Sequence, residues 1–325
     1  MSFAKKALCF SVLSSFGFAA AATAQSALNG AGASFPAPFY QRAFSGLSGK
    51  GINVNYQSVG SGAGVRQFIA GTVDFGATDE PIKDAEAAKV KRGVVQFPAV
   101  GGTIAIAYNK ADCKGLKLSQ KQAVGIFLGS IKTWDQLKCG KGPITVAHRS
   151  DGSGTTFAFT NSLSAFSSEW KSKVGEGKSV KWPVGVGGKG NEGVAGILGN
   201  TPGSIGYVNQ AFVKGKLQAA ALQNKDGNYV LPTLAGGAAA LNNIRLNADL
   251  AGEDANPAGA KSYPISTLTW ILAYQKGNGA KAGKIREAML YLLGPAQNQA
   301  DELGYVPLKG DILKKAKAAV AKIGA

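Results

Sequence analysis

The chain has 325 residues and a formal net charge of +17, because 36 lysines and arginines outnumber 19 aspartates and glutamates. That length suits one large or two medium domains, and so positive a charge favours anionic partners: nucleic acid, anionic surfaces or small anions. Nucleic acid is disfavoured, because the lysines are dispersed and no nucleic-acid-binding motif is present. A metal site is also disfavoured, because His148 is the only histidine and the chain has no Cys-x-x-Cys motif.

The first residues have the pattern of a secretory signal peptide. Lys5 and Lys6 form a basic start, residues 7–18 are mostly apolar, and Ala22-Thr23-Ala24 is an A-x-A cleavage signal. The alternative, a transmembrane anchor, needs a longer apolar run. We therefore expect export and cleavage after Ala24. Removing Lys5 and Lys6 leaves 34 of the 36 basic residues against 19 acidic ones, a net charge of +15.

The mature chain keeps two cysteines, Cys113 and Cys139, since Cys9 lies in the signal peptide. An even number of cysteines in an oxidising compartment favours a disulfide. The alternative is a pair of buried thiols. We expect the disulfide.

In chain order, the first part of the mature sequence alternates between helical and strand patterns. The expected elements are a glycine-rich turn at 30–36, a helix over 39–47, a strand over 52–56, a glycine turn at 60–64, a short helix over 65–69 and a strand over 73–77. Small polar residues lie beside these elements at Ser34, Ser61 and Asp79. Because ligands gather beyond the carboxyl ends of strands in open α/β sheets, these three loops are predicted to form one binding edge.

The rest of the chain continues the α/β pattern. Ser119 and Gln122 form a capping box at the start of a helix. The other expected elements are strands over 94–100, 103–108, 144–147, 205–208 and 263–274, helices over 194–198, 285–293 and 312–323, and a loop or helix start at 236–240. The runs at 103–108 and 263–274 are candidate strands crossing between two lobes.

The run from His148 to Phe157 (HRSDGSGTTF) is the strongest local signal for a ligand. Phe159, Leu163 and Phe166 follow it with helical spacing, so the run is placed at a helix start, where free N–H groups and the helix dipole attract anions. Its glycines allow a close backbone approach, and Arg149 adds a charged, planar fork. The alternative is an ordinary Asp-Gly turn followed by a Ser or Thr N-cap.

A secreted phosphatase or serine hydrolase is the enzymatic alternative for the same run. Ser153 between two glycines superficially suggests a nucleophile, but the G-x-S-x-G elbow is absent, and His148 is poorly placed to act as its base. A phosphatase would also need metal ligands or a second basic cluster. An extracellular adhesive or scaffold protein is a third class of function.

Several segments, in order along almost the whole mature chain, carry a resemblance to a known family. They are residues 30–38 (GAGASFPAP), 56–62 (YQSVGSG), 72–79 (TVDFGATD), 149–155 (RSDGSGT), 182–183 (WP) with 187–191 (GGKGN), and 203–208 (GSIGYV). The chain resembles the periplasmic phosphate-binding subunit of bacterial phosphate ABC importers. The resemblance implies an α/β, two-lobed periplasmic-binding-protein fold of type II, with mixed sheets flanked by helices and two crossing hinge strands. Lobe I would comprise residues 25–102 with 265–325, and lobe II residues 103–264.

The resemblance also implies a phosphate site, carried over position by position. Lobe I would contribute Ser34, the backbone N–H of Phe35, Ser61 and Asp79. Lobe II would contribute Arg149, Ser153, the backbone N–H of Gly154, and Thr155. Asp151 matches the family carboxylate that pairs with Arg149, whereas His148 is expected to lie beside the site without binding the ligand. Gly62 stands where some members have a second serine.

The protein implied by the resemblance is a periplasmic monomer that captures inorganic phosphate and delivers it to an inner-membrane ABC permease, with no enzymatic activity, cofactor, metal or nucleic-acid partner. Phosphate near neutral pH keeps at least one proton, which the ionised carboxyl of Asp79 accepts. Sulfate has no such proton, so its lone pairs would be repelled by Asp79. Binding of sulfate, molybdate or another oxyanion is the nearest competing function, and Asp79 argues against the fully deprotonated ones. Arsenate is protonated like phosphate, so the sequence does not exclude arsenate binding.

Overall fold

The computed structural model describes residues 27–325, so the expected cleavage after Ala24 lies outside the described residues. The strands are β1 (Leu28–Gly32), β2 (Val54–Ser58), β3 (Phe75–Thr78), β4 (Val94–Asn109), β5 (Lys117–Leu118), β6 (Thr145–Arg149), β7 (Val186–Gly188), β8 (Ser204–Asn209), β9 (Gln218–Ala219), β10 (Ala221–Gln223), β11 (Tyr229–Val230) and β12 (Ser266–Tyr274). The helices are α1 (Ala37–Ser45), α2 (Ser61–Ala70), α3 (Asp84–Ala87), α4 (Gln120–Leu128), α5 (Gly154–Phe166), α6 (Ser168–Lys173), α7 (Gly190–Asn200), α8 (Leu234–Leu241), α9 (Ala282–Leu292) and α10 (Gly310–Val320).

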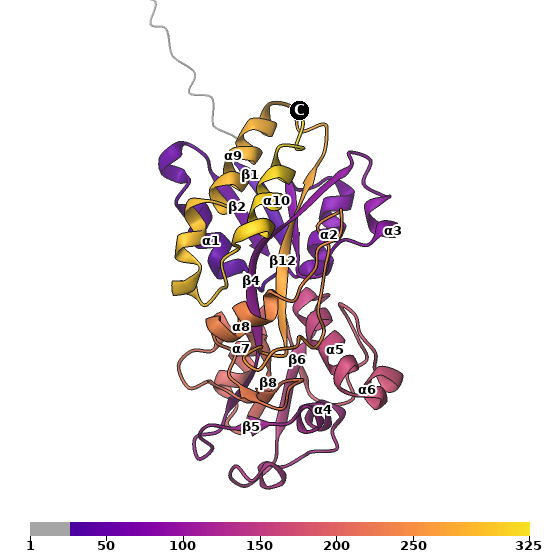
Figure 1. Ribbon diagram of the computed structural model, residues 1–325, viewed down its shortest axis with the longest axis vertical. Helices are drawn as coiled ribbons and strands as arrows, with labels where there is room; N and C mark the ends of the chain where they lie inside the picture. Colours follow the sequence, from indigo (N-terminus) through magenta and orange to yellow (C-terminus); the bar gives the residue numbers. More distant parts are fainter. Residues whose placement is uncertain (1–26) are drawn as a thin grey trace, which may run out of the picture.

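Two lobes are arranged along the long axis of the molecule (Figure 1). The first lobe contains β1–β3, α1–α3, α9 and α10, and the second contains α4–α8 with the short strands β5–β11. The long strand β4 runs through both. Its residues 94–103 pair with β12, and its residues 104–109 pair with β8. The two apolar runs expected as separate strands at 94–100 and 103–108 are therefore one continuous strand, which joins the lobes.

Within residues 27–325 the strand order of the main sheet is β2-β1-β3-β12-β4-β8-β6-β7. β1 pairs in parallel with β2 and β3, and β6 pairs in parallel with β7 and β8. β12 is antiparallel to both of its neighbours. The sheet is thus mixed, and the carboxyl ends of each parallel group lie at one edge of its lobe. This agrees with the expected α/β, two-lobed fold.

β1 lies where the sequence indicated only a glycine-rich turn over 30–36, so that expectation was wrong for residues 30–32. Glycine is usually unfavourable within a strand, but here it permits close packing. A Cβ on Gly30 would overlap the ring of Phe75, and one on Gly32 would overlap the carbonyl of Ala77. The turn itself is confined to residues 33–36, between β1 and α1.

Other boundaries shift by a few residues for local reasons. The predicted capping box is confirmed, since the backbone N–H of Gln122 donates to Ser119 Oγ at 3.1 Å and Gln122 Oε1 accepts from the N–H of Ser119 at 2.9 Å. Residues 236–240 lie inside α8, which Thr233 caps. The expected strand over 263–274 begins only at Ser266, because residues 263–265 form the connection that enters β12.

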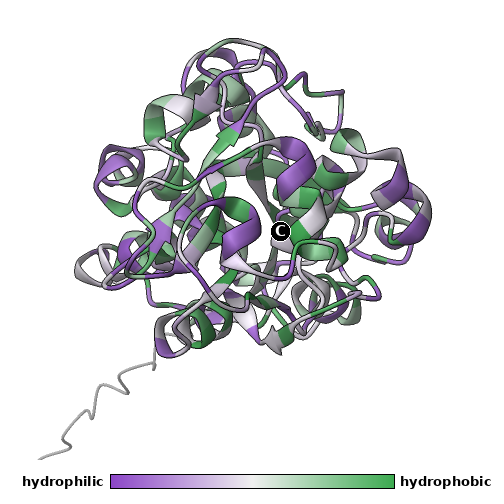
Figure 2. Cartoon of the chain, turned by 90° about the horizontal axis from the view of Figure 1, so that it is seen from below, coloured by the Kyte–Doolittle hydropathy of each residue, from purple (hydrophilic) through white to green (hydrophobic). Residues whose placement is uncertain are grey.

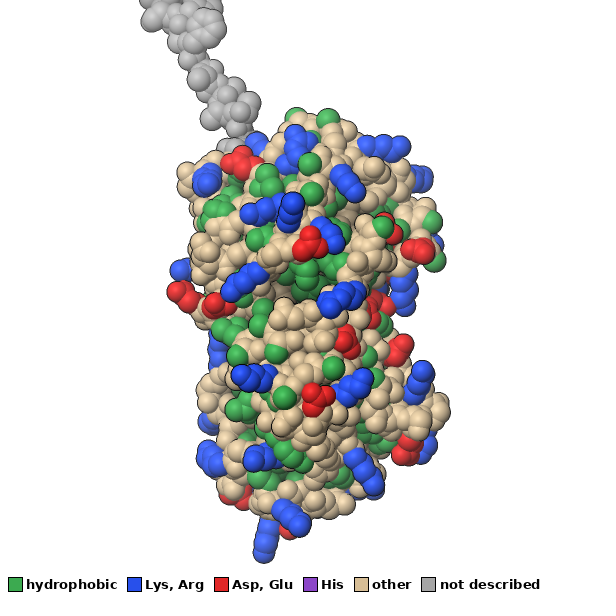
Figure 3. Space-filling model, viewed as in Figure 1, with side chains coloured by type: hydrophobic (Ala, Val, Ile, Leu, Met, Phe, Trp, Pro, Cys, Tyr) green, Lys and Arg blue, Asp and Glu red, His purple; other side chains and the backbone are tan. Residues whose placement is uncertain are grey.

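Apolar side chains fill the interior of both lobes. Figure 2 shows hydrophobic stretches (green) beside hydrophilic ones (purple) along the chain. Lysines and arginines are spread over both lobes on the face seen in Figure 3. Cys113 and Cys139 form the predicted disulfide, with their Cα atoms 4.9 Å apart. None of the helices between residues 27 and 325 is long and apolar enough to cross a membrane.

Candidate functional site

The expected site residues come from loops at the carboxyl edges of the two parallel strand groups. Ser34 follows β1, Ser61 follows β2, and Asp79 follows β3. In the second lobe, Arg149 ends β6 and Ser153 precedes α5. The two edges meet: the N–H of Gly62 donates to the carbonyl of Gly152 at 2.8 Å. The structure thus brings residues far apart in sequence to one boundary between the lobes.

Ser34 is buried and bridges the lobes through Asn191, at the start of α7. Its Oγ accepts from both the backbone N–H and the side-chain amide of Asn191, each at 2.9 Å. The same amide nitrogen lies 3.2 Å from Thr155 Oγ1, and Asn191 Oδ1 accepts from the N–H of Asn209 at 2.8 Å. Because two donors occupy the lone pairs of Ser34, its own hydroxyl proton is left to donate.

Ser61 and Ser153 are arranged in the same way. Ser61 Oγ accepts from the N–H of Asp79 at 3.3 Å, and Ser153 Oγ caps α5 by accepting from the N–H of Thr156 at 3.0 Å. Both side chains are buried. Hydroxyls that already accept from backbone N–H groups favour an anionic neighbour, to which they donate.

Arg149 is buried and holds Asp151 through two hydrogen bonds, from Nε to Oδ1 at 2.7 Å and from Nη2 to Oδ2 at 2.5 Å. Burial acts to raise the pKa of Asp151, but the hydrogen bond and charge of Arg149 outweigh it and leave that pKa below its ordinary value. Nη1 of Arg149 is buried and has no hydrogen-bond partner among residues 27–325. A buried guanidinium nitrogen without an acceptor is costly, so this N–H group remains able to donate to an acceptor that enters the site.

Asp79 is the buried carboxyl of the site. Thr269 Oγ1 donates to its Oδ1 at 2.8 Å, and Thr155 Oγ1 donates to its Oδ2 at 3.2 Å. Burial raises the pKa of Asp79 to about 7, although the hydrogen bond from Thr269, the charge of Arg149 and the hydrogen bonds from Thr155 act to lower it. This buried carboxyl is therefore able to lose or gain a proton close to neutral pH.

The start of α5 approaches the first lobe at Gly154. A Cβ there would lie 2.6 Å from both the backbone nitrogen of Asp79 and Ser61 Oγ. The first N–H groups of a helix have no intrahelical acceptor, so Gly154 and Thr155 bring helix N–H groups to this boundary. Phe35 is also buried, and its carbonyl accepts from the hydroxyl of Tyr305 at 2.6 Å.

Sequence reasoning missed two side chains that organise the site, Asn191 and Thr269. Asn191 lies within the glycine-rich segment 187–191, and a polar side chain at the first turn of a helix was the available signal. Thr269 gave no such signal, because it lies inside an apolar strand. His148 stacks on Trp182 with ring centroids 4.9 Å apart. Its Nδ1 lies 3.0 Å from the backbone carbonyl oxygen of Arg149, so it lies directly beside the site.

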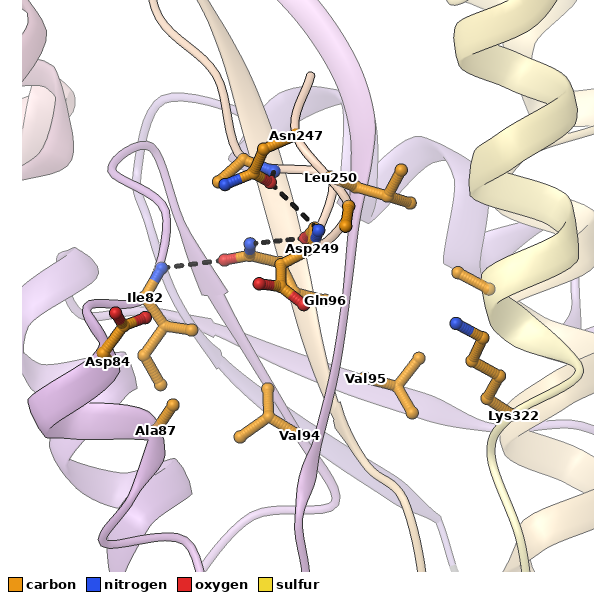
Figure 4. Close-up of a pocket in the computed structure, with 13 residues that line it drawn as sticks. Ile82, Asp84, Ala87, Val94, Val95, Gln96, Asn247, Asp249, Leu250 and Lys322 are labelled. Atoms are coloured by element: carbon orange, nitrogen blue, oxygen red, sulfur yellow. Dashed lines mark hydrogen bonds between the residues drawn. The ribbon is translucent and has the colours of Figure 1, made fainter.

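Residues 27–325 contain no group of three or more His, Cys, Asp or Glu side chains that could hold a metal ion. A separate pocket of about 310 Å³ lies between β4, α3 and the C-terminal segment on one side and residues 247–251 on the other (Figure 4). Gln96 spans it, accepting from the N–H of Ile82 at 2.7 Å and donating to the carbonyl of Asp249 at 3.1 Å. None of the expected site residues lines that pocket.

Comparison with known proteins agrees with this geometry. Residues 19–292 match the model of a PBP superfamily domain. The chain is 43% identical to the "Phosphate-binding protein PstS" of Haemophilus influenzae over 90% of its own length and 91% of that protein. It is 41% identical to the protein of the same name from Pasteurella multocida, over 97% and 95% of the two chains.

A solved structure has the same fold. It is a "high affinity periplasmic phosphate-binding protein (PfluDING) bound with phosphate", with a TM-score of 0.76 at 23% identity, covering 90% of this chain and 93% of that one. At that identity the likeness concerns the fold alone. With the family model matching most of its length and curated relatives above 40% identity, the chain belongs to the PBP superfamily and, within it, to the family of the PstS proteins.

Proposed function

We propose that this protein is an extracytoplasmic binding protein that captures inorganic phosphate between its two lobes and delivers it to an ABC-type permease. The relatives in its family are named phosphate-binding proteins; such proteins serve transport and are not enzymes. On this proposal the exported chain works in the periplasm as a monomer after cleavage behind Ala24. Its partners are phosphate and an inner-membrane permease complex, not nucleic acid.

The proposed ligand shell consists of the residues expected from the sequence. Ser34, Ser61 and Ser153 donate hydroxyl protons. Phe35, Gly154 and Thr155 donate backbone N–H groups, since the hydroxyl of Thr155 already donates to Asp79. Arg149 completes the donors, and Asp79 is the one carboxyl among them. The observation that carries the proposal is Arg149 Nη1, a buried nitrogen with no acceptor among the described residues. A phosphate oxygen would satisfy it.

Charge supports the same assignment. Asp151 neutralises Arg149 through two hydrogen bonds, so the site holds an anion mainly through directed donors. Asp79 is the one acceptor in this shell of donors, and it accepts a hydrogen bond from the proton that phosphate retains near neutral pH. Sulfate brings only lone pairs to the same carboxylate, and this repulsion in a buried site disfavours its binding.

Lobe boundaries are part of the proposal. Lobe I comprises residues 25–102 with 265–325 and lobe II residues 103–264, with hinges near Thr103 and Tyr263. Support comes from β4, whose pairing partner changes from β12 to β8 after Thr103.

Calorimetric titration of the purified protein with phosphate, sulfate and arsenate tests the function. We expect one phosphate per chain, much weaker sulfate binding, and no hydrolysis of a chromogenic phosphate ester. Absence of phosphate binding, or equal binding of sulfate, would overturn the proposal.

A further inference from the structure

Beside the candidate site, a buried ion pair joins the two lobes. Glu80 directly follows Asp79 in the first lobe, and 2% of its surface is exposed. Its Oε1 lies 3.0 Å from Nζ of Lys83, and its Oε2 lies 2.8 Å from Nζ of Lys178. Lys83 belongs to the same lobe, whereas Lys178 follows α6 in the second lobe.

Lys178 is fixed at both ends. Its backbone carbonyl accepts from the N–H of Ser153 at 2.8 Å, directly at the start of α5. Its ammonium contacts Glu80 and lies 3.5 Å from Oε2 of Glu86, also in the first lobe. One residue thus connects the cap of the anion-binding helix to the opposite lobe.

Lys178 also balances an excess of carboxylates. Glu253 lies close enough to Glu80 and Glu176 for their charges to act on it. Desolvation and the charges of Glu80 and Glu176 together raise the pKa of Glu253 to about 7, although the charges of Lys83 and Lys178 act to lower it. Asn161 donates to Glu253 at 3.2 Å. Without Lys178, the buried Glu80 and the more exposed Glu176 and Glu253 would keep only Lys83 as a nearby cation among these groups.

The energetic consequence depends on whether the lobes are together. Closure removes Glu80 from water, and a buried carboxylate without its partner is strongly unfavourable. With the lobes apart, Glu80 is hydrated and still has Lys83. The Lys178–Glu80 pair therefore favours the closed arrangement over the open one.

We propose that Lys178 and Glu80 form a latch between the lobes, which holds the closed state and sets how tightly and how long the ligand is retained. The latch rests on the proposed phosphate-binding function and deepens it. Lys178 is a positioning residue, because its side chain acts on closure and not on the ligand.

Lys178→Met tests the latch by removing the ammonium while keeping a side chain of similar length. We expect the dissociation constant for phosphate to rise at least tenfold, mostly through faster release of radiolabelled phosphate chased with excess unlabelled phosphate. Lys173→Met is the matched control. It removes the same charge from an exposed lysine that pairs with Glu169 on its own helix, and it should leave affinity and release unchanged.

Glu80→Gln separates the latch from simple attraction between Lys178 and phosphate. If Lys178 acted only through its charge, removing the negative charge of Glu80 would tighten phosphate binding. The latch predicts weaker binding, and a double variant no worse than Lys178→Met alone, because the two changes remove one interaction. Thermal melts of every variant identify any that fail to fold.

The outcomes are distinct. Wild-type protein that does not bind phosphate refutes the proposed function, whatever the variants do. Wild-type binding with unchanged release from Lys178→Met refutes the latch and leaves the function standing. Tighter binding by Glu80→Gln also refutes the latch. Weaker binding by both single variants, without additivity, supports it.

Discussion

Thr269 donates a hydrogen bond of 2.8 Å to Oδ1 of Asp79 from the strand β12, which pairs along its length with the lobe-spanning strand β4. Thr155, from the helix α5 of the other lobe, donates to the second oxygen. Both hydroxyls use their protons on the carboxyl, which keeps only lone pairs to offer. The acceptor that we assign to the phosphate proton is therefore oriented by β12 and by the opposite lobe together.

Asp79→Asn should change selectivity more than affinity. The amide keeps the shape of the carboxyl but also presents an NH₂ group, which can donate to a sulfate oxygen. Phosphate can adapt to either end of the amide. We expect the ratio of phosphate to sulfate affinity to fall at least about tenfold, roughly 1.4 kcal/mol, in calorimetric titrations of wild type and variant.

Arg149→Ala is the contrasting variant. It removes a charge and a fork of donors that all oxyanions use, so phosphate and sulfate binding should weaken together and their ratio should stay near that of wild type. An unchanged ratio in Asp79→Asn would show that Asp79 is not the proton acceptor, even if phosphate is the ligand.

The raised pKa of Asp79 predicts a stability that falls with pH. Burial raises this pKa from its ordinary value of 3.8 to about 7, so between these values the folded protein binds more protons than the unfolded chain. The stabilising contribution of Asp79 is therefore fully present below pH 3.8 and is lost as pH rises through about 7. The shift between these two pKa values corresponds to a change of roughly 4 kcal/mol at most in the free energy of unfolding.

Thermal or denaturant unfolding between pH 4 and 7.5, on wild type and Asp79→Asn, measures this contribution. Desolvation and neighbouring carboxylates also raise the pKa of Glu253 to about 7. Because Glu253 is present in both proteins and lowers the stability of both as pH rises, the difference between the two stability curves isolates Asp79. Wild type should lose stability relative to the variant as pH rises. Parallel curves would mean that the carboxyl is not desolvated in the folded protein.

Much of this arrangement could be predicted from the sequence because short motifs report local chemistry. The run from His148 to Phe157 was placed at a helix start, with a Ser or Thr N-cap as the alternative to an anion site. The helix α5 does begin there, and the Ser153 hydroxyl accepts from the N–H of Thr156. The loops at Ser34, Ser61 and Asp79 were predicted to share one edge because each lies beside an apolar element and carries a small polar residue. Parallel pairing of β1 with β2 and β3 brings the strand ends that precede them together.

The remaining features depend on contacts between distant segments, which periodicity does not report. The glycines of β1 indicated a turn, because the ring of Phe75 that requires Gly30 comes from another strand. Thr269 is a threonine within an apolar strand, and only its pairing beside β3 places it against Asp79. The Lys178–Glu80 pair joins residues almost a hundred positions apart, with no local pattern to mark it.

The disulfide should contribute measurably to stability. Cys113 and Cys139 are separated by 26 positions, and a closed loop of that length is worth about 3 kcal/mol in the chain-entropy model. Replacing both cysteines with serine should therefore lower the melting temperature by several degrees. A reducing agent should destabilise the wild type and leave the double variant unchanged. Free thiols in the native, unreduced protein would refute the pairing in solution.

Phosphate should bring the lobes together in solution. The described contacts between Asp79 and Thr155, and between Gly62 and Gly152, require the two edges to touch. We expect the lobes to separate about the hinges near Thr103 and Tyr263 when phosphate is removed, with little change inside each lobe. Small-angle scattering should give a smaller radius of gyration with phosphate. Identical profiles at saturating phosphate would contradict hinge closure.

Gly154→Ala should weaken phosphate binding by obstructing closure. The added Cβ would lie 2.6 Å from the backbone nitrogen of Asp79 and from Ser61 Oγ, closer than such atoms pack. Both groups belong to the first lobe, so the collision exists only when the lobes meet. Calorimetry should show at least tenfold weaker phosphate binding.

Gly196→Ala, in the helix α7, provides the control for that variant. A Cβ at Gly196 meets nothing within 4 Å, and alanine favours a helix interior over glycine by roughly 0.5–1 kcal/mol. The control should therefore bind phosphate as wild type does and melt at the same or a higher temperature. Both variants add the same methyl group to a helix. If only Gly154→Ala loses phosphate affinity, the loss comes from a collision at the boundary between the lobes. Wild-type affinity in Gly154→Ala would mean that α5 and the Asp79 loop do not meet so closely in the bound protein.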